Sequence, residues 1–567
     1  MANQVTRITT IPGVSRDGTH LDGQYYSDAQ WCRFVLGKPK KMGGYRNIAQ
    51  FTAPVLSVYT FSKTTENLVH CFSTSKIEAV LTDINGNGGA VYDRTPVGFI
   101  TYSLYSWTVD TAYDMTGGGK SRIYAHAARN DGVPTPIFYG TVDTTEVLTP
   151  ITLLDVTKPA TTGNITTGTP TLVLTSATGY VIGSLIRVTG AGVAGVDLFT
   201  DITNLVGTTA TLRDNASTTV AAAVVNHILG CDGGIVTIGA YLFYYGSRGL
   251  IANTDLNNPT LAFTGDANMV NPVGSRVTKG LPVKGGGQSP AGMFWSEDSV
   301  IKVSFVGGTL LFQYDIVTSQ SSLLSANTVM EYDGAYYWLG YDRALAFVGG
   351  VKELPNTLNN NWFYESLNWG YAYKVWATKV PRYGEIWWFF PKGESTKCNW
   401  ALIYNIRENT WYDTPIERSA GYYVQNFRFP LWGAEDGKLW SHEFNWDKID
   451  GESISSVESY FITHDIGFPT GGAVQEAPQG ANAWTRIERV EPDFAQTGDM
   501  TVEVLSKEYA NSPTISLGKL SFGADTVRVD MRHQARIMTI KFSSNDAGGS
   551  YWMGAPLLHL ELGDRRE

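Results

Sequence analysis

Residues 385–413 read EIWWFFPKGESTKCNWALIYNIRENTWYD, and this stretch sets the fold class. Two runs in it, residues 385–390 and 400–404, consist almost wholly of aromatic and aliphatic side chains. Pro, Gly, Ser and Asn residues separate the two runs. Short apolar runs bounded by turn residues predict neighbouring β-strands. We therefore expect an all-β protein.

Similar pairs of aromatic strands recur elsewhere in the chain. Residues 57–72 read SVYTFSKTTENLVHCF, residues 237–254 read TIGAYLFYYGSRGLIANT, and residues 330–350 read MEYDGAYYWLGYDRALAFVGG. The pattern predicts strands at residues 55–61, 235–245, 250–252, 299–306 and 335–339, with a turn at Gly246-Ser-Arg-Gly249. Because the spacing is irregular, it predicts a degenerate β-propeller, with a sandwich or barrel as the alternative. Residues 358–373 allow a short helix.

Composition changes along the chain and divides it into regions. In residues 151–225 Thr, Val, Ala and Gly dominate and aromatic residues nearly vanish, which indicates a compact inserted β-domain. Further strands are predicted at residues 501–505, 526–531, 536–542 and 557–562, in a separate β-sandwich-like platform domain. The expected regions are an N-terminal arm (1–50), a first part of the propeller (51–150), the inserted small β-domain (151–228), the continued propeller (229–450) and the C-terminal platform domain (451–567).

Composition also limits the function. The 567 residues carry a net charge of −10, with 12% aromatic and only 17% charged residues, which does not fit a helical bundle. The only basic cluster is Lys38, Lys40 and Lys41, so tight binding to DNA phosphates is not expected. No stretch is apolar for about 20 residues, so no membrane span is predicted, and the N-terminus has no signal-peptide pattern.

Two motifs resemble ligand-binding loops and fail at specific positions. Gly117-Gly-Gly-Lys-Ser121 resembles the end of a phosphate-binding loop, but Asp114 stands where that loop requires Gly. Asp83-Ile-Asn-Gly-Asn-Gly88 resembles the start of a calcium loop, but Arg94 stands at the position of the bidentate Glu. We interpret the first as a glycine-rich turn and the second as a β-hairpin turn.

Other chemistry-bearing residues form no recognisable pattern. Ser15-Arg-Asp-Gly-Thr19 partly resembles an Asp-box turn, but Gly18 comes too early, so an ordinary turn is expected. The histidines are scattered, at His20, His70, His126, His227, His442, His464, His533 and His559. The cysteines are far apart, at Cys32, Cys71, Cys231 and Cys398, and are expected to be buried thiols. We therefore assign no catalytic, cofactor-binding or metal-binding residue and expect no cofactor.

Aromatic clusters offer one further binding hypothesis. Three aromatic clusters could together form a platform for sugars. They are Tyr336-Tyr-Trp338, Trp387-Trp-Phe-Phe390 and Trp362-Phe-Tyr364. Such clusters more often form blade cores and contacts between subunits, and we favour that interpretation.

Four stretches of the chain resemble the tail hub or nozzle proteins of podoviruses, including the packaged-DNA stabilisation proteins. The stretches are Arg16-Asp-Gly-Thr19 with Trp31-Cys-Arg-Phe34 and Gly37-Lys-Pro-Lys-Lys-Met-Gly-Gly-Tyr45; Tyr337-Trp-Leu-Gly340 with Tyr341-Asp-Arg343 and Glu353-Leu-Pro355; Glu385-Ile-Trp-Trp388 with Tyr404-Asn405 and Glu408-Asn-Thr-Trp411; and Glu491-Pro-Asp-Phe494 with Asp530-Met-Arg532 and Glu561-Leu-Gly-Asp-Arg-Arg566. The resemblance covers most of the chain outside the inserted domain. It rests on the order in which these stretches follow one another along the chain.

This resemblance implies a structural virion protein and no enzyme. The subunit is expected to be made in the host cytoplasm and to form a ring, a homohexamer, below the portal and adaptor of the phage tail. The ring would continue the DNA channel with a lumen lined by Asp and Glu, retain packaged DNA without binding it tightly, and open for ejection. Expected partners are other copies of the chain, the adaptor and portal-proximal proteins, and tail fibres or spikes.

Two alternatives remain. A receptor-binding tailspike would bind or depolymerise polysaccharide with aromatic faces and a carboxylate pair, but the long solenoid repeats usual in tailspikes are absent from the sequence. A β-propeller interaction scaffold would show regular blade repeats, which are absent too. The structural ring is the reading that we favour.

Overall fold

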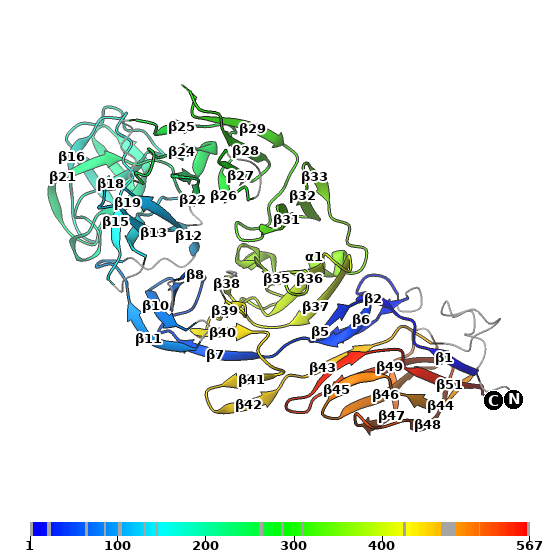
Figure 1. The fold of residues 1–567 in the computed structure, drawn as a ribbon. Coiled ribbons are helices and arrows are strands. Elements are labelled where there is room, and N and C mark those ends of the chain that lie inside the picture. The colour runs from blue at the N-terminus through cyan, green and yellow to red at the C-terminus, as the bar shows by residue number, and fades with distance from the viewer. Residues whose placement is uncertain are drawn as a thin grey trace.

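The computed structural model describes residues 4–19, 24–62, 66–83, 87–99, 105–129, 132–142, 146–259, 265–284, 289–308, 310–422, 427–466, 484–509 and 511–563. These residues form small, mainly antiparallel β-sheets, most of which follow one another around a ring (Figure 1). The predicted fold class is confirmed, since a degenerate β-propeller carries an inserted small β-domain and a C-terminal β-sandwich-like domain. No helix in the described ranges is long and apolar enough to cross a membrane.

The propeller has seven blades within the described residues, each of four antiparallel strands. Blades one to three are β8 (Ser57–Ser62), β9 (Asn67–Phe72), β10 (Ile77–Thr82) and β11 (Gly88–Asp93); β12 (Tyr105–Asp114), β13 (Lys120–Arg129), β14 (Ile137–Thr141) and β15 (Thr149–Ile151); and β22 (Gly234–Ile238), β23 (Tyr241–Tyr245), β24 (Ile251–Asn253) and β25 (Asn268–Val270). Blades four to six are β26 (Val277–Pro282), β27 (Ala291–Ser296), β28 (Val300–Phe305) and β29 (Phe312–Thr318); β30 (Met330–Tyr332), β31 (Ala335–Leu339), β32 (Ala344–Phe347) and β33 (Val351–Glu353); and β34 (Trp376–Val380), β35 (Glu385–Phe390), β36 (Trp400–Asn405) and β37 (Thr410–Pro415).

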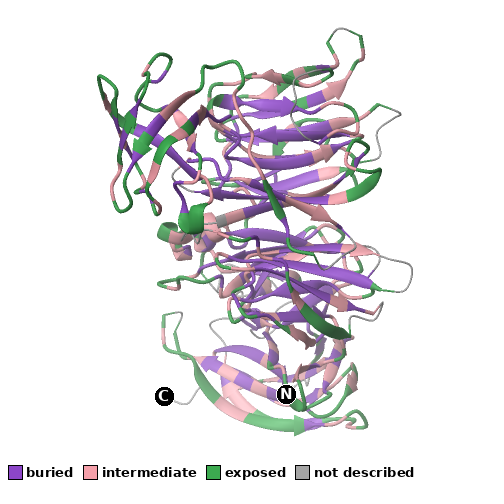
Figure 2. Cartoon of the chain, turned by 90° about the vertical axis from the view of Figure 1, so that its left-hand side faces the viewer, coloured by how far each residue is buried: buried purple, intermediate pink, exposed green. Residues whose placement is uncertain are grey.

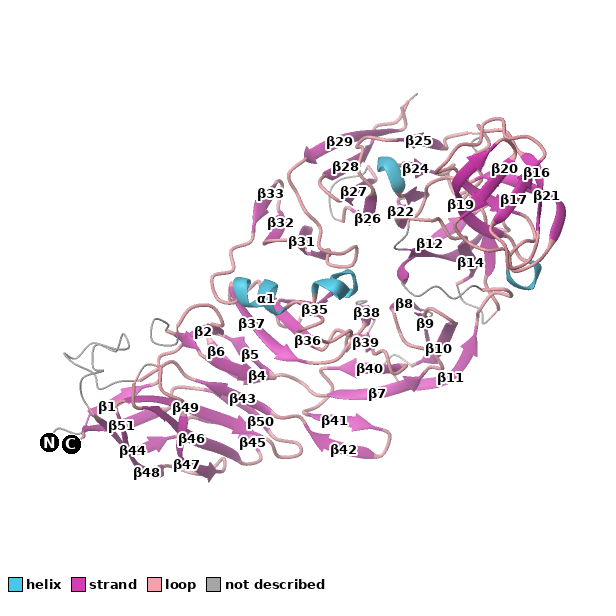
Figure 3. Cartoon of the chain, turned by 180° about the vertical axis from the view of Figure 1, so that it is seen from behind, coloured by secondary structure: helices cyan, strands magenta, loops and turns pink. Residues whose placement is uncertain are grey.

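The seventh blade joins the two ends of the ring. It consists of β38 (Ala420–Tyr422), β39 (Leu431–Gly433), β40 (Lys438–His442) and β7 (Tyr45–Gln50), so its outer strand comes from the N-terminal region. Strand β7 pairs antiparallel with β40, from Lys438 opposite Gln50 to His442 opposite Tyr45. A hairpin of β41 (Asp447–Asp450) and β42 (Ser453–Ser456) extends this sheet beyond β7 (Figure 3). The ring is thus closed by backbone hydrogen bonds between distant segments.

The aromatic doublets of the sequence are explained by burial on both faces of a blade. Adjacent residues of a strand point to opposite faces. On β35, Trp388 packs into the core between blades five and six, while Trp387 packs into the core that continues toward blade seven. On β23, Tyr244 and Tyr245 divide in the same way between two cores. Figure 2 shows such buried residues running through the stacked blades.

The inserted domain is a closed six-stranded barrel between blades two and three. Its strands are β16 (Thr161–Ile165), β17 (Thr171–Leu174), β18 (Leu185–Val188), β19 (Leu198–Val206), β20 (Thr209–Leu212) and β21 (Val220–His227). Aliphatic side chains and a single aromatic one, Tyr180, form its buried core, which agrees with the scarcity of aromatics in this stretch. The chain enters and leaves at one place, where Leu154 forms an antiparallel bridge with Ile228. Arg129 of β13 lies 3.5 Å from Asp214 of the barrel.

Replacing residues 156–226 by an Asn-Gly turn is expected to leave the propeller folded. The backbone N–H of Asp155 donates to the carbonyl of His227 at 2.9 Å, so a two-residue turn can continue this pairing. The ion pair lost with the barrel joins Asp214, 30% exposed, to Arg129, 6% exposed; because removal of the barrel opens Arg129 to water, we expect its loss to cost less than about 1 kcal/mol. Calorimetry should show the main transition moved by only a few degrees. Loss of cooperative unfolding would contradict the separation of barrel and propeller.

The C-terminal region forms three packed sheets that include most strands of the N-terminal arm. The sheets are β1 (Gln4–Arg7), β51 (Leu557–Leu562), β44 (Thr485–Glu491) and β48 (Val529–Ala535); β4 (Asp28–Gln30), β43 (Ser459–Ile462), β49 (Ile537–Ser544), β46 (Met500–Lys507) and β47 (Ile515–Phe522); and β45 (Phe494–Thr497), β50 (Ser550–Met553), β6 (Lys38–Lys41) and β5 (Cys32–Val35). Blue N-terminal strands therefore lie among red C-terminal ones in Figure 1. Residues 1–50 are divided between this sandwich, blade seven and a short parallel pair of β2 (Ile11–Val14) with β3 (Tyr25–Tyr26).

Two local predictions need correction. Residues 235–245 were predicted as one strand but form the hairpin β22–β23, because Gly239 adopts a left-handed φ of 63° that ends the first strand. Residues 358–373 contain two short helices, α1 (Asn360–Ser366) and the 3₁₀ helix η4 (Trp369–Lys374), in place of one. Both corrections concern turns within correctly located elements.

Candidate functional sites at the sandwich joint and the propeller axis

Gly117–Gly119 lie in the turn between β12 and β13, and Lys120 and Ser121 begin β13, which confirms the interpretation as a glycine-rich turn. Asp114 Oδ1 accepts the Gly117 N–H at 2.7 Å, and Asp114 Oδ2 lies 2.7 Å from Arg122 Nε. The carboxylate therefore takes a backbone N–H that a bound phosphate would need, and its negative charge would repel phosphate.

Asp83 and Asn87 lie between the antiparallel strands β10 and β11, in the connection predicted as a hairpin turn, and residues 84–86 of the motif lie outside the described part. Asn87 donates its backbone N–H to Asp83 Oδ1 at 2.8 Å. Arg94 is fully buried and donates to the carbonyls of Glu146 and Thr141, both at 2.8 Å. A guanidinium in place of the bidentate carboxylate does not suit Ca²⁺.

The Ser15–Thr19 loop attaches the N-terminal region to blade six. Arg16 lies 3.0 Å from Asp413 of β37 and 2.7 Å from Asp28 of β4. Asp17 accepts the backbone N–H groups of Asn361 and Trp362, at 2.9 and 2.7 Å, at the start of α1. The loop is therefore an anchor as well as a turn; His20, which follows it, lies outside the described residues.

The remaining sequence candidates are mostly structural. Across the described ranges, no group of three His, Cys, Asp or Glu side chains is placed to hold a metal ion. All four cysteines are free and buried, and burial raises the pKa of Cys32 to about 12. Tyr336, Trp338 and the 387–390 aromatics are buried in blade cores. Outside the predicted clusters, Tyr341 and Trp369 are 55% and 49% exposed and stack with centroids 6.4 Å apart.

A buried ionic cluster joins the sandwich to the propeller. Arg33 of β5 lies between Glu385 of β35 and Glu443, which follows β40. The Arg33 Nε lies 2.9 Å from Glu385 Oε1, Nη1 donates to Glu443 Oε2 at 2.8 Å, and Nη2 contacts Glu443 Oε1. The Tyr383 ring covers the guanidinium carbon at 3.7 Å. None of the three charged side chains is more than 9% exposed.

Neutral donors complete the coordination of Glu385. Tyr412 Oη and Trp387 Nε1 donate to its two carboxylate oxygens at 2.7 and 2.9 Å. Burial raises the pKa of Glu385, and the positive charge of Arg33 opposes that rise. Buried charges persist only where partners compensate for lost hydration, so this cluster requires the sandwich and propeller to stay in one arrangement.

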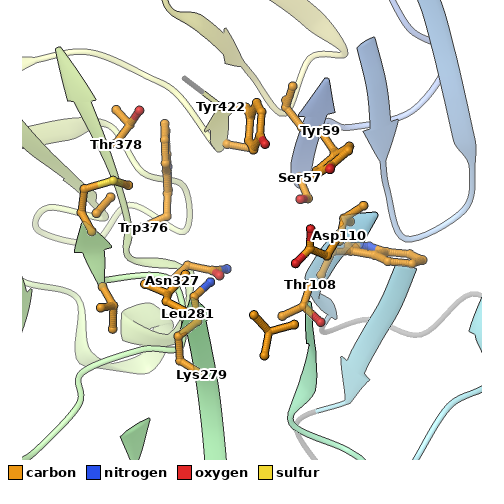
Figure 4. Close-up of a pocket in the computed structure, with 18 of the residues that line it drawn as sticks. Ser57, Tyr59, Thr108, Asp110, Lys279, Leu281, Asn327, Trp376, Thr378 and Tyr422 are labelled. Carbon is orange, nitrogen blue, oxygen red and sulfur yellow. The ribbon is translucent and has the colours of Figure 1, made fainter. Parts of the chain in front are cut away.

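The second site is a pocket at the propeller axis, called the axial channel below, and residues from the innermost strand of every blade line it. Its volume is about 390 Å³, near the lower end of the ~300–1,000 Å³ found for small-molecule pockets. Figure 4 shows Asp110 and Thr108 on one side, Lys279 and Asn327 on another, and Tyr59 and Tyr422 above them. The channel therefore has the size of a small-molecule pocket.

Charged side chains in the channel are unequally paired. Lys379 of β34 lies 3.0 Å from Glu331 of β30, and Lys284 lies 3.8 Å from the same carboxylate. Asp110 accepts the backbone N–H groups of Thr111 and Thr237, both at 2.8 Å. Burial raises the pKa of Asp110 against the effect of those hydrogen bonds.

Lys279 of β26 differs from the other charged groups in the channel. Its Nζ has no hydrogen bond or ion pair with any residue that the structure describes. Burial lowers the pKa of Lys279 to about 8, while the negative charge of Asp110 acts in the opposite direction. The channel therefore offers an amine and a carboxylate, together with hydroxyl and amide groups, to a small polar molecule.

Sequence reasoning did not identify these site residues. Arg33 and Glu385 are 352 positions apart, so nothing local reveals their contact. The available signal was a charge beside apolar residues, in Trp-Cys-Arg-Phe and in Glu-Ile-Trp-Trp. For Lys279 and Asp110 no signal exists, because the axis is defined only once all seven blades are in place.

No family model and no curated protein matches the chain. Among solved structures, a crystal structure of BBS1N in complex with ARL6DN is 8% identical with a TM-score of 0.35, and the WD40 beta propeller domain of Doa1 is 9% identical with a TM-score of 0.33. Each alignment covers 70% of this chain and 97% of the other. Because both scores are low, the fold assignment rests on strand order: the chain is a seven-bladed β-propeller closed by β7.

Proposed function

We propose that the chain is a structural subunit of a short-tailed bacteriophage tail, in the hub or nozzle ring. There it would continue the DNA channel below the portal and adaptor, retain packaged DNA and permit its ejection. The observation that carries the proposal is where the podovirus-like stretches lie. Trp31-Cys-Arg-Phe34 and Glu385-Ile-Trp-Trp388, from opposite parts of the chain, contribute the Arg33–Glu385 pair of the sandwich joint. A structural subunit that acts by holding its neighbours in place needs such a fixed joint between its propeller and its sandwich.

The net charge supports a role beside DNA. A ring repeats the charge of −10 with every copy, and like-charge repulsion at short range would keep DNA from adhering to the wall. In this proposal the DNA passes through the centre of the ring of subunits, and each propeller lies in the wall. The subunit acts without catalysis, through contacts with its own copies, the adaptor, and fibres or spikes.

Cryo-EM of the particle containing this chain tests the proposal. We expect six copies around the tail axis, between the adaptor and the tail tip, with acidic side chains facing the lumen. Size-exclusion chromatography with light scattering gives a second measurement on the purified chain and its neck partners. A chain that stays monomeric in that mixture, or that lies away from the tail axis in the particle, would contradict the proposal.

A receptor-binding role is the second candidate, and the exposed Tyr341–Trp369 pair favours it. Stacked rings on a surface offer apolar faces to a sugar, and Trp and Tyr are also frequent at protein interfaces. Binding of host polysaccharide that is lost in Trp369→Ala, with release of oligosaccharide, would support this candidate. If Trp369→Ala instead weakens ring assembly and no polysaccharide binds, the pair belongs to a subunit interface.

A further inference from the structure

The axial channel carries a positive charge excess that contrasts with the acidic chain around it. Five charged side chains line it, three lysines (Lys279, Lys284 and Lys379) and two carboxylates (Asp110 and Glu331). Glu331 is shared by Lys379 and Lys284, and Asp110 is bound by two backbone N–H groups. The lining is therefore net positive by one charge, and Lys279 is the lysine of this set without a salt bridge to any described residue.

The location of Lys279 makes this excess costly without a partner. The side chain is only partly exposed and lies on the innermost strand of blade four, where burial disfavours the charged form. A desolvated ammonium is stabilised by an anion in hydrogen-bonding distance. An anion in the channel would supply the negatively charged hydrogen-bond partner for Lys279 that none of the described residues supplies.

Neutral polar groups that line the same pocket as Lys279 suit an anion with several oxygen atoms. Asn327 lies beside Lys279 and donates one Nδ2 hydrogen to Ser106 Oγ at 3.2 Å, while Thr378 and Tyr422 line the pocket on the side away from Lys279 (Figure 4). Amide and hydroxyl groups donate hydrogen bonds to oxygen acceptors, and a lysine amine acts as a compact positive charge. Asp110 faces the same space and would oppose the anion, which limits the affinity but leaves the channel net positive.

We propose that the axial channel of the propeller binds a small oxyanion, a carboxylate or a sulfate- or phosphate-type group, with Lys279 as its charged partner. The channel volume of about 390 Å³ admits the anion alone or as one group of a small metabolite. The proposal does not depend on the role in a phage tail, because a single chain contains the whole channel.

Isothermal titration of the full chain with sodium sulfate and with sodium acetate tests the proposal. Both anions keep constant charge between pH 6 and 9, and they separate tetrahedral from planar oxyanions. We expect one of these two anions to bind with 1:1 stoichiometry. Lys279→Met should weaken its binding about tenfold or more, since a charge-assisted hydrogen bond is lost. Lys302→Met is the matched control, because Lys302 is exposed on β28 of the same blade and should bind as wild type does.

Two further measurements keep the test decisive if Lys279→Met folds poorly. Asp110→Asn removes the opposing charge and should tighten binding, and binding to the wild type should weaken as the pH rises past about 8, where Lys279 loses its proton. The other titratable groups that line the channel besides Asp110 are Glu331, Lys284, Lys379, Tyr59, Tyr245 and Tyr422. Absence of binding to the wild type, or equal binding to folded Lys279→Met, would overturn the proposal.

Discussion

A chain that begins at Tyr45 is expected to keep the seven-bladed propeller and to lose the folded C-terminal sandwich. The truncation retains β7, which closes blade seven, but removes β1, β4, β5 and β6 from the three sandwich sheets. It also removes eight buried apolar side chains from the shared core: Ile8, Val14, Tyr26, Ala29, Trp31, Cys32, Phe34 and Met42. At about 1.5–3 kcal/mol for each large apolar side chain, the loss is comparable with the ~5–15 kcal/mol stability of a typical domain.

Limited proteolysis with mass spectrometry measures this outcome directly. Cleavage should concentrate between residues 457 and 567 of the truncated chain, while residues 45–450 stay protected. The chain without residues 156–226 is the control, because it loses more residues but keeps every strand of the sandwich. Protection of residues 484–563 in the truncated chain would show that the C-terminal strands fold without the N-terminal ones.

Individual strands could be predicted from the sequence, but the pairing between distant strands could not. Three predicted strand runs, 335–339, 385–390 and 557–562, coincide with β31, β35 and β51. Local composition suffices for β31 and β35 because side chains buried on both faces are mostly apolar, and for β51 because its buried and partly exposed residues alternate as in a strand with one buried face. Pairing between β7 and β40 joins residues nearly 400 positions apart, and no local pattern encodes it. The number of blades and the mixed origin of the sandwich therefore required the structure.

The candidate sites likewise divide into features that the sequence could predict and features that required the structure. Motif failures at Asp114 and Arg94 were visible in sequence because each motif fixes a residue type at a fixed spacing. The structure gives both side chains other partners, Arg122 for Asp114 and backbone carbonyls for Arg94. Lys279 stands in the ordinary strand VTKGLP, and only its place at the axis distinguishes it.

Arg33→Met should destabilise the protein by about 3–5 kcal/mol, the usual cost of removing one partner from a buried ion pair. Methionine fills much of the space of the arginine stem, so the main loss is the charge between Glu385 and Glu443. Urea denaturation followed by tryptophan fluorescence measures the free energy of unfolding. Arg343→Met is the control: Arg343 is 47% exposed, and its nearest carboxylates lie 3.7 Å away, so its loss should cost less than about 1 kcal/mol.

The pH dependence of Arg33→Met distinguishes lost charge from lost packing. Without Arg33, the pKa of the buried Glu385 rises further above its unfolded value of about 4.3, because burial is no longer opposed. A carboxyl group with a raised pKa in the folded state destabilises folding at neutral pH, and this penalty disappears as the pH falls below the unfolded value. The deficit of Arg33→Met relative to wild type should therefore shrink from pH 7 toward pH 4, and Arg33→Met/Glu385→Gln should recover part of it at pH 7. If Arg33→Met lowers the free energy of unfolding by the same amount at both pH values, Arg33 stabilises the protein through packing. The joint would then not depend on the charge of Arg33.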